Sequence, residues 1–112
     1  MKRIHYASGS LLTGDAIADV LVRYAAALAI NTAAAEVRAP AILESGEVGE
    51  IMMLLGPASQ ILAETEHFGG PELRDDDFVS ELDGRISALG PRRATFVRLG
   101  TEGVDDIDVD ML

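Results

Sequence analysis

The sequence predicts an α+β domain, a two-layer α/β sandwich in which two helices cover one face of an antiparallel sheet of four or five strands. Two long stretches place apolar residues at the three- and four-residue spacing of amphipathic helices. Between them, residues 51–55 form an apolar run without alternation, which is typical of a strand with both faces covered. The predicted element order is β-α-β-β-β-α, followed by an optional last strand.

The first strand and the first helix are predicted at the start of the chain. Residues 2–8 alternate, with Ile4 and Tyr6 on one side, as in a strand with one buried face. Thr13 is the expected N-cap of a helix that ends at residues 31–32. That helix is apolar most of the way round, so we expect either other elements of the chain or a second copy of it to cover its back.

Three strands are predicted in the middle of the chain. Residues 35–43 and 48–56 flank a short polar turn that contains a glycine, so we expect them to form an antiparallel hairpin. Residues 60–66 follow the Gly-Pro break at 56–57 and read as a third strand. We expect this strand to extend the hairpin as a meander.

The second helix and the end of the chain follow. Asp75 is the expected N-cap of a helix that stops at the Gly-Pro pair at 90–91. Residues 94–99 are compatible with a last short strand. We therefore predict a single α+β domain over residues 1–99 and an acidic, flexible tail over residues 100–112.

The predicted element order resembles that of ribosome-hibernation factors over residues 2–89. This resemblance lies in element order and implies binding to ribosomal RNA. The predicted helices of this chain, however, lack the basic residues that such binding needs. We do not carry the function of that family over to this chain.

Charge narrows the range of partners. The formal net charge is −10, and residues 57–112 hold thirteen acidic but only five basic side chains. A field of this sign repels nucleic acid and anionic membrane surfaces, so we expect neither as a partner. A basic protein partner stays open, and the alternative is that the acidity only keeps the protein soluble.

The composition also excludes several chemistries. The chain has no cysteine, which removes disulfides, thiolate nucleophiles and cysteine-bound zinc. No apolar stretch approaches the roughly 20 residues of a membrane span, and no secretion signal is recognisable, so a cytoplasmic location is expected. Arginine outnumbers lysine strongly among the basic residues, which suggests a bacterial protein with GC-rich coding.

The strongest metal candidate lies at the end of the third middle strand. Glu64 and Glu66 share one face because strand residues alternate, and His67 at the strand end can complete the site. The competing interpretation is an ordinary exposed strand that ends in a loop histidine. No catalytic residue is assigned, and no cofactor is expected.

The loop over residues 56–60 is the candidate ligand site. Gly56, Ser59 and Gln60 can present backbone and side-chain donors to a ligand or an anion. The loop lacks the several glycines and the lysine of a phosphate-binding loop. The alternative is that the Gly-Pro pair only bends the chain between two strands.

These observations lead to a first hypothesis, a small non-enzymatic homodimer that associates through the free face or an edge of its sheet. Met52 and Met53 are consecutive and so point to opposite faces, while two helices can cover only one of them. The alternatives are a small metal-dependent hydrolase, or an acidic inhibitor of a basic or nucleic-acid-binding partner.

Overall fold

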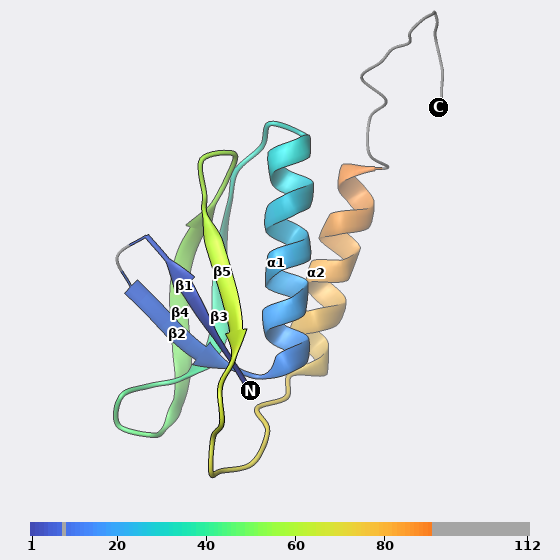
Figure 1. Ribbon diagram of the computed structural model, residues 1–112. Coiled ribbons are helices and arrows are strands. Elements are labelled where there is room, and N and C mark those ends of the chain that lie inside the picture. Colours follow the sequence, from blue (N-terminus) through green and yellow to red (C-terminus); the bar gives the residue numbers. More distant parts are fainter. Residues whose placement is uncertain (8, 91–112) are drawn as a thin grey trace, which may run out of the picture.

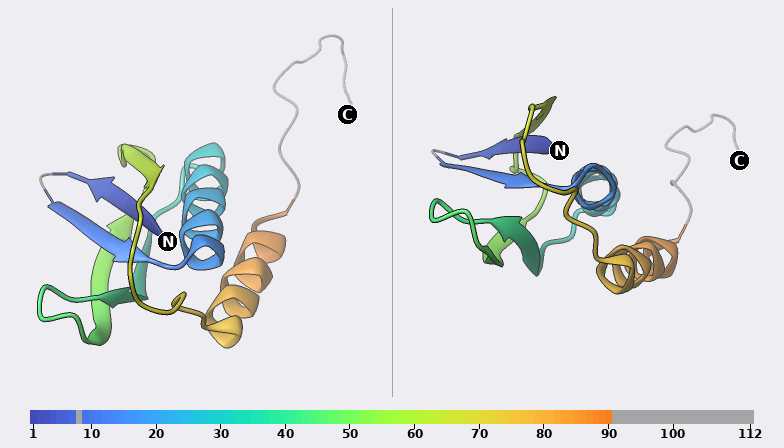
Figure 2. Two further views of the ribbon diagram at one scale, coloured as in Figure 1. Left: turned by 60° about the horizontal axis from the view of Figure 1, so that its bottom comes forward. Right: turned by 90° about the horizontal axis from the view of Figure 1, so that it is seen from below.

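The structure is a computed structural model that describes residues 1–7 and 9–90, so the expected strand over 94–99 and the acidic tail lie outside the described residues. Its elements, in chain order, are β1 (Lys2–Tyr6), β2 (Gly9–Thr13), α1 (Asp15–Ile30), β3 (Ala35–Ile42), β4 (Val48–Leu55), β5 (Ile61–Thr65) and α2 (Asp76–Leu89). The five strands form one antiparallel sheet in the order β4-β3-β2-β1-β5. Both helices lie on one side of this sheet (Figures 1 and 2), which confirms the predicted α+β class.

Strand β2 is the element that the sequence analysis does not predict. It pairs with β1 in a tight hairpin, with Ile4 opposite Leu11. Thr13 ends this strand, is fully buried, and donates its hydroxyl to the carbonyl of Pro40 at 2.8 Å. The prediction of Thr13 as a helix N-cap is therefore wrong, and Gly14 takes that position. The extra strand also changes the element order on which the resemblance to ribosome-hibernation factors depends.

The N-terminus of α1 packs against the loop between β5 and α2. Gly14 has no side chain to cap the helix, and Glu72 supplies the missing acceptor, with its Oε2 2.6 Å from the backbone N–H of Asp15. A carboxylate at this position also interacts favourably with the helix dipole. The approach is so close that a Cβ on Gly14 would lie 1.8 Å from the carbonyl oxygen of Leu73. Glycine is required here for lack of space.

The core lies between α1 and the sheet. The apolar residues of α1 at three- and four-residue spacing form one buried stripe, which consists of Ile17, Val20, Leu21, Tyr24 and Leu28. Helix α2 covers one flank of α1, with Leu82 almost fully buried between them. Arg23 of α1 binds Asp83 of α2 at 2.7 Å. The back of α1 is thus covered in part by the chain itself.

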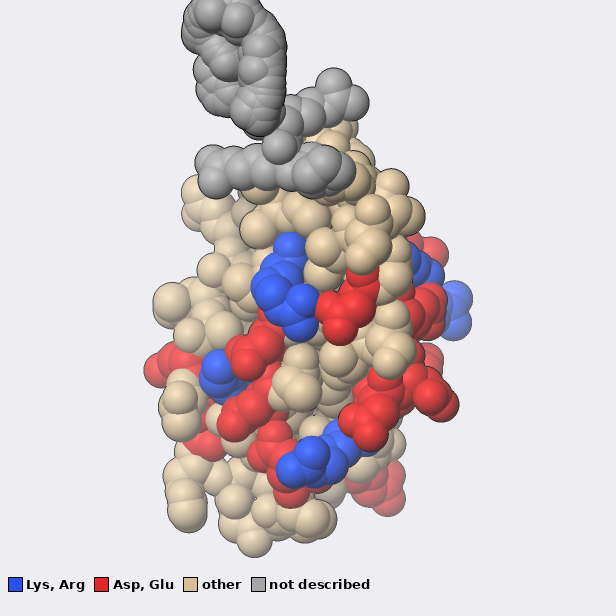
Figure 3. Space-filling view, turned by 90° about the vertical axis from the view of Figure 1, so that its right-hand side faces the viewer, with Lys and Arg blue, Asp and Glu red and all other residues tan. Residues whose placement is uncertain are grey.

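Helix α2 begins and ends at the residues that the sequence predicts. Asp75 caps it, because its Oδ1 accepts a hydrogen bond of 3.0 Å from the backbone N–H of Phe78. Gly90 follows the last turn with φ of 84°, a conformation that glycine adopts easily. Acidic and basic side chains are mixed over this side of the molecule (Figure 3), as on a solvated surface. Neither described helix has the length and apolar character that crossing a membrane needs.

The sheet is split into two halves. Strands β3 and β4 pair along eight residues each, and β1 pairs along five residues with both β2 and β5. A single residue pair, Leu12 with Ile42, joins β2 to β3. Pro40 faces Glu50 in a pair of the β3–β4 ladder without mutual backbone hydrogen bonds, so the backbone groups of Pro40 point away from β4. Because proline has no N–H, it removes a donor from the edge that faces β2.

The position of β5 corrects a prediction. The hairpin of β3 and β4 is confirmed, but β5 does not extend it as a meander. It pairs instead with β1 at the opposite edge of the sheet. Residues 56–60 carry the chain from one edge to the other, and this crossing leaves β4 at the edge.

Candidate functional site

Strand β4 presents two contrasting faces. On the helix side, Met53 and Leu55 are buried, with exposed fractions of 5% and 0%. On the other side, Val48, Met52 and Leu54 are 63%, 59% and 62% exposed. Within the described residues of one chain, the prediction of a strand covered on both faces is therefore wrong. The two methionines do point to opposite faces, as predicted.

The outer edge of β4 has no strand beside it in the described part of the chain. Leu43 N–H donates to Glu47 C=O across the hairpin turn at 2.8 Å, which sets the alternation of the ladder. Odd-numbered residues of β4 therefore bond to β3, and even-numbered residues direct their N–H and C=O groups outward. The exposed side chains belong to the same even-numbered residues. We call Val48, Glu50, Met52 and Leu54, with their backbone groups, the open edge.

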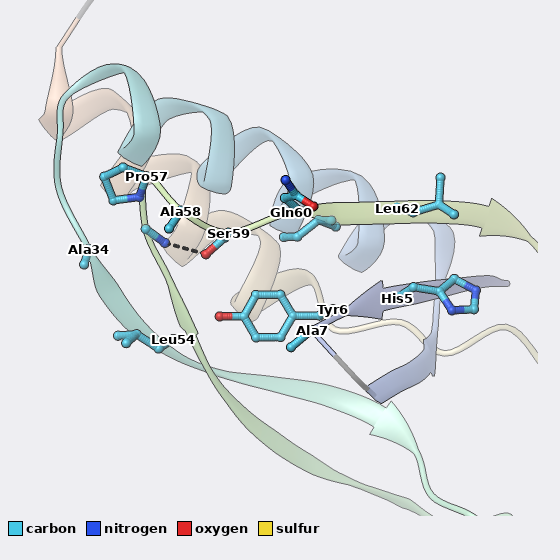
Figure 4. Close-up of a pocket in the computed structure, with 12 residues that line it drawn as sticks. His5, Tyr6, Ala7, Ala34, Leu54, Pro57, Ala58, Ser59, Gln60 and Leu62 are labelled. Atoms are coloured by element: carbon cyan, nitrogen blue, oxygen red, sulfur yellow. Dashed lines mark hydrogen bonds between the residues drawn. The ribbon is translucent and has the colours of Figure 1, made fainter.

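A hollow opens where the two halves of the sheet diverge. It has a volume of about 700 Å³ and lies between the end of β4, the end of β1 and the start of β5. The ring of Tyr6 projects from β1 into this space, and Gly56, Ser59 and Gln60 all contribute to its wall (Figure 4). The structure thus brings the three predicted ligand-site residues to one concave surface.

The loop over residues 56–60, which borders the hollow, forms internal hydrogen bonds. The backbone N–H of Gly56 donates to Ser59 Oγ at 2.8 Å, and the N–H of Ser59 donates to Gly56 C=O at 3.0 Å. The Gly56 N–H is thus occupied, which does not favour the anion-binding alternative. None of the twelve lining residues is Asp, Glu, Lys or Arg. Ligand binding by Gly56, Ser59 and Gln60 stays a prediction, and these walls suit an uncharged molecule.

The face of β1 and β5 opposite the helices holds one ion pair and one histidine–carboxylate contact. Arg3 binds Glu66 through two hydrogen bonds of 2.6 and 2.8 Å, and it also donates to Ser10 Oγ at 3.1 Å. His5 Nε2 lies 2.6 Å from Glu64 Oε1. The hydrogen bond from Arg3 lowers the pKa of Glu66, and the same bond raises the pKa of Arg3. This half of the free face thus carries paired polar groups beside the exposed Leu62.

These two contacts involve both carboxylates of the predicted metal site. Glu64 and Glu66 each already have a cationic or protonatable partner, so neither carboxylate is free. Across residues 1–7 and 9–90, no three His, Asp or Glu side chains are arranged to hold a metal ion. Metal binding by Glu64, Glu66 and His67 stays a prediction.

Sequence reasoning missed what β1 contributes to the hollow and to the contacts of Glu64 and Glu66. His5 and Tyr6 lie fifty or more positions from the loop and the carboxylates that they meet, and only the β1–β5 register brings them together. The alternation of residues 2–8 was the available signal, but it does not name the neighbouring strand. Comparison of the chain with protein families, with characterised proteins and with solved structures finds no match.

Proposed function

We propose that this protein is a non-enzymatic interaction module that forms a homodimer through the open edge of β4. One observation carries the proposal, namely three large exposed apolar side chains, interrupted only by Glu50, on an unpaired strand edge within the described residues. Such an edge is a template for strand addition, and proteins that stay monomeric usually shield it with charge, proline or a covering element.

Electrostatics favour this surface for self-association. Two copies that each carry a net charge of −10 repel each other, so a stable contact needs a region of low charge. Glu50 is the only charged residue among the eight of β4. The helix side of the molecule carries many charges of both signs (Figure 3), which makes it a poorer surface for burial.

The opposite edge of the sheet is less suited to a dimer contact. Leu62 of β5 is as exposed as Leu54. Its neighbours on the free face are polar or charged, however, with Gln60 on one side and Glu64, which contacts His5, on the other. An apolar partner placed there would have to desolvate these groups, which costs free energy.

Hydrogen exchange of the full chain tests the proposal. At about 100 μM we expect the amides of Val48, Glu50, Met52 and Leu54 to exchange at least about tenfold more slowly than at about 1 μM, because dimer formation bonds them. The amide of Met53 bonds to β3 within the chain and is the control, with similar protection at both concentrations. Rapid exchange of the four amides at both concentrations would contradict the proposal.

A further inference from the structure

We infer that two copies join β4 to β4 in an antiparallel register whose two-fold axis passes beside Ile51. This inference rests on the proposed homodimer and specifies its geometry. The two sheets would become one continuous sheet, with both helical layers on the same side of it. A two-fold contact of this kind uses the same surface on both subunits.

The ladder alternation limits the registers that are available. Only the even-numbered residues of β4 direct backbone groups outward. Each of them must therefore pair with an even-numbered residue of the other copy. The two-fold axis lies midway between the numbers of two paired residues, and the mean of two even numbers is a whole number. The axis therefore passes beside a residue and not between two residues. Three central positions, at residues 50, 51 and 52, keep most of the strand paired.

The three registers differ in charge and in the number of bonds. An axis at Glu50 sets the two copies of this carboxylate directly opposite each other, which is destabilising. An axis at Met52 pairs Val48 with Gly56 of the second copy, but the Gly56 N–H is already bonded to Ser59 Oγ. An axis at Ile51 pairs Val48 with Leu54 and Glu50 with Met52. It engages all four outward residues of both strands.

The Ile51 register also gives complementary charge. Arg38 lies opposite Met52 in the β3–β4 ladder, and within residues 1–7 and 9–90 neither Arg38 nor Glu50 has an ion-pair partner. In this register Glu50 of one copy faces Met52 of the other, and Arg38 stands on the next strand. Two strand spacings separate their Cα atoms by about 10 Å, which two long side chains can bridge over the methionine.

The same register pairs the two most exposed apolar side chains of β4. Val48 and Leu54 become direct cross-strand neighbours, and the two-fold axis repeats this contact. Each side chain is thereby shielded by one of similar size. Of the three registers, only this one pairs Val48 with Leu54. It also keeps the two Glu50 side chains apart.

Single-cysteine crosslinking tests the register, since the chain has no cysteine of its own. Facing Ile51 residues form a pair without mutual backbone bonds, with Cα atoms about 4.5 Å apart, which lies within the disulfide range. We expect Ile51→Cys to give a disulfide-linked dimer under mild oxidation, at least about tenfold more than Met52→Cys, whose Cα atoms lie beyond about 7 Å. Both variants are compared in the native state and in denaturant, where crosslinking is expected to vanish.

The outcomes separate the register from the dimer itself. Preferential crosslinking of Met52→Cys, or of neither variant while light scattering still gives a dimer, would overturn the register and leave the homodimer standing. A monomer mass for the unsubstituted chain would overturn both. Preferential crosslinking of Ile51→Cys in a dimeric protein supports the inference.

Discussion

Leu54→Lys is expected to convert the proposed dimer into monomers and to raise its dissociation constant by at least about 100-fold. Full burial of a leucine contributes about 1.5–3 kcal/mol, and the two-fold axis buries the exposed 62% of this side chain twice. Losing both contributions weakens binding by about 2–4 kcal/mol, and each 1.4 kcal/mol is a factor of ten. A lysine opposite Val48 also adds a charge that must be desolvated.

Leu62→Lys is the matched control for this variant. Both leucines are 62% exposed on the same face of the sheet, and both substitutions change the net charge equally. Leu62 lies on β5, at the far edge from β4. Light scattering over a dilution series is expected to show a monomer for Leu54→Lys and an intact dimer for Leu62→Lys. Equal dissociation of both variants would place the contact elsewhere.

Gly14→Ala is expected to destabilise the fold by about 1–3 kcal/mol, in the range of overpacked sites. The new Cβ would lie 1.8 Å from the Leu73 carbonyl oxygen, and the contacting atom belongs to the backbone. The loop that carries Glu72 and Leu73 must then move away from α1. That movement also weakens the hydrogen bond from Asp15 N–H to Glu72. Urea unfolding measures the loss.

Gly69→Ala is the control for the loop. Gly69 lies in the same connection between β5 and α2, and a Cβ there would meet no atom within 4 Å. Its φ is outside the left-handed region, so alanine is tolerated and the unfolding free energy should change by less than about 1 kcal/mol. Equal effects of the two alanines would show that the close approach at Gly14 does not limit stability.

Local patterns in the sequence predicted the helices well. The buried stripe of α1 and the cap at Asp75 depend on residues three or four positions apart, which a single sequence displays. The β3–β4 hairpin was predictable for the same reason, because a short turn connects its strands.

Strand β2 and the partner of β5 were not predictable in the same way. Residues 9–13 carry Gly and Ser before two leucines and a threonine, and this short stretch shows no clear period. Its place in the sheet follows from pairing with β1 and from the bond of Thr13 to Pro40. The partner of β5 is likewise set by packing across the whole sheet. Non-local pairing of this kind leaves no signature within a window of ten residues.

The apolar run in β4 predicts that both faces are covered, but it does not predict which polypeptide covers them. Residues 51–55 predict cover on both faces, whichever polypeptide supplies it. The described chain covers the side of Met53 and leaves that of Met52 exposed. A sequence does not distinguish cover by its own helices from cover by a second copy. In the same way, the spacing of Glu64 and Glu66 did not reveal that His5 and Arg3 pair with them.

The mass of the full chain in solution is the most direct test of whether two copies form a dimer. Sedimentation equilibrium from about 1 to about 100 μM covers the range in which a dimer of moderate affinity forms and dissociates. We expect a mass of twice the 11.9 kDa of one chain at the upper end, falling on dilution toward that of a single chain. A mass of 11.9 kDa at every concentration would mean that the open edge of β4 stays in water, and it would rule out the proposed homodimer.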